Sequence, residues 1–62
     1  MTIIEKLVIK YNNRAIGEIW RTDEEYFPWN YLHYKSDLEY GTVIRDEAID
    51  SLIDLEKSFA TA

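Results

Sequence analysis

The sequence predicts an α+β domain: an antiparallel sheet of three to four strands, N-terminal hairpin first, with one C-terminal amphipathic helix packed on one face. Residues 46–59 divide into an apolar and a polar half when placed on a helix of 3.6 residues per turn. A helix of about four turns needs a partner for its apolar side, and strand-like residues precede it. A length of 62 residues allows a single domain, residues 1–62, with a small core.

Residues 3–11 and 14–22 are the predicted hairpin strands. The pair Asn12 and Asn13 lies between them, and asparagine tolerates the positive φ that a two-residue primed turn requires. In that register Ile9 lies opposite Ile16.

The same register places Val8 opposite Gly17. A glycine inside a strand marks either a bulge or a point where another backbone comes close. We expect one of these at Gly17.

The second half of the chain contains two further strands and the helix. A third strand is predicted near residues 29–35, after Pro28, which cannot donate a hydrogen bond to a neighbouring strand. A short fourth strand follows over residues 38–44. The helix is predicted to begin near Arg45–Asp46, with Asp46 as its N-cap and Glu47 in the first turn, where negative charge is favoured.

Charge is distributed unevenly along the chain. Residues 1–21 contain four basic and two acidic residues, a balance of +2, and residues 22–62 contain three basic and ten acidic residues, a balance of −7, which together give the net charge of −5. An acidic surface is repelled by phosphate backbones, so the charge argues against nucleic acid and favours a protein partner with a basic surface. The alternative is that acidity only keeps a small protein soluble.

Cysteine is absent, so neither a disulfide nor a thiolate metal site is predicted, and we expect no cofactor. Apolar runs are at most three residues long, too short for a membrane span or a signal-peptide core. These features predict a soluble cytoplasmic protein without contact to a membrane.

Aromatic residues are concentrated in the middle of the chain, in a number that exceeds what a one-helix core can bury. Alternation along the third strand puts Trp29, Tyr31 and His33 on one face and Asn30, Leu32 and Tyr34 on the other. Tryptophan and tyrosine are enriched among residues that dominate protein–protein binding energy. We therefore predict a partner-binding patch of exposed rings, consisting of Trp20, Tyr26, Phe27, Trp29 and Tyr31.

Three alternatives use the same rings differently. They complete an undersized core, or they stack nucleobases in a single-stranded nucleic-acid binder, or they bury against a second copy in a homo-oligomer. The acidic residues around the rings weigh against nucleobase stacking.

Four acidic residues form a second candidate partner-binding set on the helix. Asp46, Asp50 and Asp54 follow one another at intervals of four residues, with Glu47 beside them. Such a row of carboxylates can imitate phosphates and steer a basic partner. The alternative is an ordinary solvated face. Because acids in one helical row rarely supply converging oxygens, no metal site is predicted there.

Two residues stand apart from these patterns. His33, the single histidine, has no nucleophile or metal-ligand pattern near it, so we expect a surface or half-buried strand residue and no catalytic role. Glu56 falls on the apolar side of the helix. It either reaches water, pairs with Arg14, Arg21 or Arg45, or faces a subunit interface.

The order of signals resembles that of small orphan proteins of phages, prophages and other mobile elements. The similarity consists of a strand, an Asn turn, the stretch RAIGEI at residues 14–19, aromatics, and a short strand before one C-terminal helix. The resemblance implies an accessory or inhibitor protein that binds a host or phage protein. The sequence thus predicts a non-catalytic interaction module that binds through the aromatic patch and the acidic helix face, in the manner of a nucleic-acid mimic.

Overall fold

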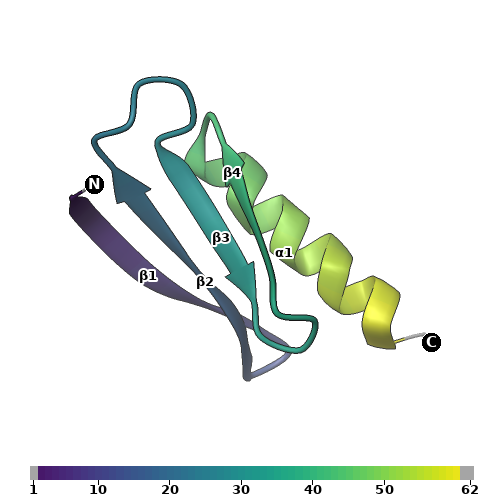
Figure 1. Cartoon of the computed structure of the whole chain (residues 1–62). Coiled ribbons are helices and arrows are strands. Elements are labelled where there is room, and N and C mark those ends of the chain that lie inside the picture. The colour runs from purple at the N-terminus through teal and green to yellow at the C-terminus, as the bar shows by residue number, and fades with distance from the viewer. Residues whose placement is uncertain (1, 61–62) are drawn as a thin grey trace.

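The computed structural model describes residues 2–60 and consists of one sheet with one helix across a face (Figure 1). The elements are β1 (Ile3–Tyr11), β2 (Arg14–Thr22), β3 (Trp29–His33), β4 (Leu38–Thr42) and α1 (Arg45–Ala60). All neighbouring strands are antiparallel, in the spatial order β1-β2-β3-β4. The predicted α+β architecture is confirmed, with the hairpin first and the helix last; β3 and β4 end earlier than predicted, at His33 and Thr42.

The turn between β1 and β2 has the conformation that its two asparagines predict. Asn12 has a φ of 54° and Asn13 a φ of 62°. Two consecutive positive φ values are those of a primed hairpin turn, whose twist matches that of the flanking strands.

We expect Asn13→Gly to stabilise the protein by about 0.5 kcal/mol, because glycine adopts this φ without the steric cost that a side chain adds. Asn13→Ala should have the opposite effect, since alanine bears that cost without the local hydrogen bonding of asparagine. Urea unfolding of the three proteins measures both shifts. Equal midpoints would mean that the turn does not constrain the hairpin.

A β-bulge interrupts the hairpin at Ile16. Ile9 pairs with Gly17 and the next residue, Lys10, pairs with Ala15, so Ile16 is an extra residue in β2. The predicted pairing of Ile9 with Ile16 is therefore wrong by one residue, because the bulge shifts the register.

Gly17 combines the two features expected of it: it adjoins the bulge, and the helix packs directly over it. A Cβ atom at Gly17 would overlap the carbonyl oxygen of Leu32 and lie 2.7 Å from Cδ2 of Leu52 in α1. The absence of a side chain at this point lets the helix approach the sheet.

The helix covers the face that carries the odd-numbered residues of β2 and β3. On this face Ile19 lies between Leu7 of β1 and Tyr31 of β3. The helix contacts β3, β2 and β4, and leaves most of β1 beyond its edge. The buried apolar core consists of Ile16, Ile19, Tyr31, Ala48 and Leu52.

The start of α1 agrees with the prediction, but its N-cap does not. The helix begins at Arg45, and Ala48 donates its N–H to the carbonyl of Ile44. The prediction of Asp46 as the N-cap is therefore wrong; Asp46 lies inside the first turn together with Glu47. Both acids still face the positive end of the helix dipole, where they are favourable.

Candidate functional site: an open sheet face and a buried His–Glu pair

Two of the five predicted aromatic anchors belong to the helix-covered face. Tyr31 is buried in the core, and its ring centroid lies 5.7 Å from that of Tyr40. Trp29 is half-buried and packs against the same core. Because Tyr31 has almost no exposed surface, its predicted role as a binding anchor is wrong; the ring completes the core instead.

Two other anchors, Trp20 and Phe27, lie on the opposite face, with the position of Asn30 between them. Trp20 pairs with Asn30, which pairs with Gly41, so these three positions share one face. A Cβ atom at Gly41 would lie 3.2 Å from Cβ of Phe27, which places the Phe27 side chain over Gly41 on that same face. The fifth anchor, Tyr26, is 73% exposed in the loop between β2 and β3.

We call this uncovered side of the sheet the open face. α1 lies on the other side of the sheet, and α1 is the one helix of the described residues. Val8 and Phe27 are 57% and 53% exposed. The apolar residues of the open face are Val8, Trp20, Phe27, Leu32 and Tyr34.

Charges on the open face balance one another. Lys6 and Lys10 alternate with Val8 along β1, and Glu18 and Glu39 lie on β2 and β4. Lys6 binds Glu18 at 2.8 Å between Nζ and Oε2, and this hydrogen-bonded contact raises the pKa of Lys6. The open face therefore mixes apolar side chains with paired charges: Glu18 lies between Val8 and Leu32 across the strands, and Trp20 lies between Lys6 and Asn30.

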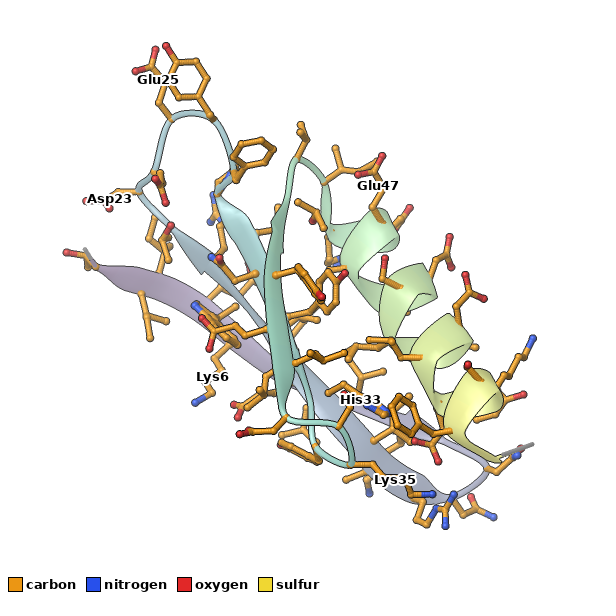
Figure 2. The ribbon with its side chains drawn as sticks, turned by 45° about the vertical axis from the view of Figure 1, so that its right-hand side comes forward. Lys6, Asp23, Glu25, His33, Lys35 and Glu47 are labelled. Atoms are coloured by element: carbon orange, nitrogen blue, oxygen red, sulfur yellow. The ribbon has the colours of Figure 1, made fainter. Side chains whose placement is uncertain are left out.

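The acidic residues of the helix lie on the other side of the molecule. Asp46, Glu47, Asp50 and Asp54 are all exposed, as predicted for a solvated helix face. Figure 2 shows Glu47 on the outer side of α1 and Lys6 on the far side of the sheet. The structure thus does not combine the aromatic and acidic sets into one surface.

A buried polar pair, which was not predicted from the sequence, links the sheet to the helix. His33 is 0% exposed, and its Nε2 lies 3.0 Å from Oε1 of Glu56, which is 4% exposed. The prediction of His33 as a surface or half-buried residue is wrong. Figure 2 shows His33 between the sheet and the C-terminal part of α1, where the ring of Phe59 lies 5.5 Å from its own, measured between centroids.

The hydrogen bonds of the imidazole assign its tautomer. The backbone N–H of Ser36 points at Nδ1 of His33 at 3.2 Å, so Nδ1 carries no proton, and the Ser36 hydroxyl, 2.7 Å from Nδ1, shares its single lone pair as the second donor. Nε2 therefore carries the proton and donates it to Glu56. The Ser36 hydroxyl also accepts the N–H of Leu38, which fixes the turn into β4.

Two cations complete the surroundings of Glu56. Nη2 of Arg14 donates to Oε2 of Glu56 at 2.7 Å, and Nζ of Lys35 lies 3.8 Å from the same oxygen. The hydrogen bond from His33 is the largest cause of a pKa of Glu56 below its ordinary value; Lys35 and Arg14 lower it further, and burial opposes them. Of the three pairings left open for Glu56, the structure shows the one with Arg14.

Ser36, His33 and Glu56 are residue types that also occur in hydrolases, but their arrangement favours a structural role. An open depression of about 280 Å³ adjoins the cluster and is lined by Arg14, Ala15, Ile16, Tyr34, Lys35 and Glu56. Ser36 is not part of its wall, and its hydroxyl already has a donor and an acceptor in the turn. A substrate in the depression would therefore meet the two cations and not the hydroxyl.

Two sequence signals pointed toward this cluster. Glu56 was the one charged residue on the apolar side of the helix, and His33 shares a strand face with Trp29 and Tyr31. When a charged residue on an apolar helix face packs against a histidine on the facing strand, both can be buried because each supplies the other's hydrogen bond.

Comparison with known proteins adds no relative: no family model, curated protein or solved structure matches the chain. Within residues 2–60, no helix is long and apolar enough to cross a membrane. The same part of the chain contains no group of three or more His, Cys, Asp or Glu side chains that could hold a metal ion.

Proposed function

We propose that this protein is an interaction module that binds a protein partner on the open face of its sheet. The observation that supports the proposal is that Trp20 shares a face without a helix with the exposed side chains of Val8 and Phe27. Trp20 lies directly between Lys6 and Asn30, with Val8 and Leu32 at diagonal positions on the neighbouring strands. Large rings near the centre of an apolar patch with a polar rim are typical of binding hot spots.

The charge pattern limits the chemistry of the partner. Lys6 and Lys10 balance Glu18 and Glu39 on this face, so a complementary surface combines apolar groups with charges of both signs. A strongly basic surface instead fits the acid row of α1, on the opposite side. We therefore assign recognition to the open face and solubility to the acid row. Binding to a larger protein also agrees with the accessory role that the resemblance implies.

A photocrosslinking phenylalanine analogue in place of Phe27 tests the proposal in cells that express the chain. We expect a discrete adduct with one protein, and the same analogue in place of Asp54 on the outer side of α1 should not form it. The partner identified in this way is then purified, and its binding to the intact chain is measured directly.

For the purified pair, we expect Trp20→Ala to weaken binding by about thirtyfold or more, the loss typical of a hot-spot tryptophan. Asp50→Lys, on the far side, should leave the dissociation constant nearly unchanged. Circular dichroism verifies that both variants are folded. If Asp50→Lys abolishes binding and Trp20→Ala does not, the acid row is the docking surface and the proposal is wrong.

A further inference from the structure

The outer edge of β1 is a long strand edge with no partner in the described part of the chain. β1 has nine residues and lies at the end of the sheet. An edge of this length presents a row of backbone N–H and C=O groups that another strand can pair. The other edge strand, β4, has only five residues.

The hydrogen bonds of β2 identify which backbone groups of β1 point outward. Thr22 donates its N–H to Pro28 O at 2.7 Å, and Ile16 O accepts the N–H of Tyr34 at 3.0 Å, so even-numbered residues of β2 bond to β3. Odd-numbered residues, among them Ile19, therefore bond to β1. Because Ile19 pairs with Leu7, the backbone groups of Leu7 point toward β2.

The backbone groups of Lys6 and Val8, on either side of Leu7, consequently point outward. Apolar side chains accompany them on both faces of the edge: Leu7 is 37% exposed on the helix side, and Val8 lies on the open face. A lysine commonly protects a strand edge from pairing. Here Nζ of Lys6 lies 2.8 Å from Oε2 of Glu18 in β2, so this side chain is directed inward over its own sheet and does not block the edge.

We propose that two copies of this chain pair antiparallel along β1, around a two-fold axis through Leu7, and so join their sheets into one. Lys6 then lies opposite Val8 of the second copy, and Glu5 lies opposite Ile9; the regular pairing ends at Ile4, the extra residue of a second bulge, in β1. Leu7 meets Leu7 in a pair without mutual hydrogen bonds, where side chains come closest.

Charge selects this register over its neighbours. An axis through Lys6 would set lysine opposite lysine, and an axis through Val8 would set Lys6 opposite Lys10. An axis through Glu5 would set two glutamates against each other. Like charges directly opposite one another destabilise strand pairing. The register at Leu7 avoids all of these contacts while it overlaps most of the strand.

Charge also selects β1 over β4. Residues 22–62 carry a balance of −7, and α1 contacts β4 but leaves most of β1 uncovered. Pairing of two β4 edges would bring two acidic helices together. Pairing of two β1 edges keeps the helices at the far ends of the joined sheet, with the +2 segment of residues 1–21 at the centre.

Single cysteines test the register, because the chain has none of its own. Two residues at position 7 would face each other at a Cα separation of about 4.5–5.5 Å, which suits a disulfide. Residues at position 3 of the two copies would be about 27 Å apart. Under mild oxidation we expect Leu7→Cys to form a linked dimer roughly tenfold faster, or more, than Ile3→Cys.

Sedimentation equilibrium at micromolar concentration tests the edge itself. We expect the native chain to show a dimer mass, Leu7→Lys to show a monomer mass with an unchanged circular dichroism spectrum, and Leu38→Lys to remain a dimer. Leu38 is a matched control because it is also 37% exposed, on β4. A monomeric native chain, equal cross-linking at positions 7 and 3, or dissociation by Leu38→Lys alone would overturn the proposal.

The two proposals fail independently. Leu7 lies on the helix side of the sheet and takes no part in the open face, so Leu7→Lys tests self-association without altering that surface. Trp20→Ala alters the open face without changing the outer edge of β1.

Discussion

The Gly17→Ala variant is expected to lose about 3 kcal/mol or more of unfolding free energy, at the upper end of what overpacking costs. The new methyl group would overlap the backbone oxygen of Leu32 in β3, and it would also lie 2.7 Å from Cδ2 of Leu52. A flexible side chain can move away, but the Leu32 carbonyl is fixed in the strand pairing. A 62-residue domain has about 3–9 kcal/mol of total stability, so this change endangers the fold itself.

Gly41→Ala is the matched control for that prediction, since both glycines lie in strands and neither has a positive φ. The nearest atom to a Cβ at Gly41 is Cβ of Phe27 at 3.2 Å, and Phe27 is an exposed loop residue that can yield. We expect a change within about 0.5 kcal/mol, as at other sites without a strong constraint. Urea unfolding followed by tryptophan fluorescence gives both values, and similar losses in the two variants would refute the close approach at Gly17.

The parts of the fold that depend on local pattern could be predicted from the sequence. The division of residues 46–59 into an apolar and a polar side predicted the helix, and the Asn12-Asn13 pair predicted the hairpin turn. The pairing register could not be predicted in the same way, because a bulge inserts one residue without a distinct sequence signal. Gly17 indicated an irregularity, but not that Ile16 was the extra residue.

The candidate site was harder to predict because it depends on which face of the sheet the helix covers. Alternation separated Trp29 and Tyr31 from Asn30 and Leu32, but it did not say which set the helix buries. The helix covers the face that contains His33. His33 and Glu56 are therefore buried together as a hydrogen-bonded pair. Tyr31 entered the core for the same reason, and Trp20 remained on the open face.

The buried Glu56 carboxylate is expected to make stability depend on pH in the acid range. Its pKa is lower in the folded protein than the ordinary value of 4.5, chiefly through the hydrogen bond from His33. The unfolded chain therefore binds the proton more readily, so this group contributes stability that is fully present above that ordinary value. The contribution is lost as the pH falls through the lower pKa of the folded state.

Glu56→Gln isolates this contribution. At pH 7 we expect the variant to be clearly less stable, because an amide leaves Arg14 and Lys35 without their counter-charge and turns an N–H₂ group toward a cation. As the pH falls through the lowered pKa of Glu56 in the folded protein, the stabilities of the two proteins should converge, since the native carboxyl is then protonated as well. Asp54→Asn, an exposed acid one half-turn earlier on α1, should follow the native pH curve closely.

Unfolding free energies of the three proteins between about pH 2 and pH 8 provide the measurement. Comparison with Asp54→Asn removes the effect of total charge, because both variants lose one carboxylate. If Glu56→Gln and Asp54→Asn give parallel curves, the His33–Glu56 pair does not hold the helix to the sheet. If the stability of Glu56→Gln, and not that of Asp54→Asn, differs from the native value at pH 7 and approaches it at low pH, the pair holds the helix to the sheet. That result would explain why this small core accommodates a histidine and a glutamate among its few buried residues.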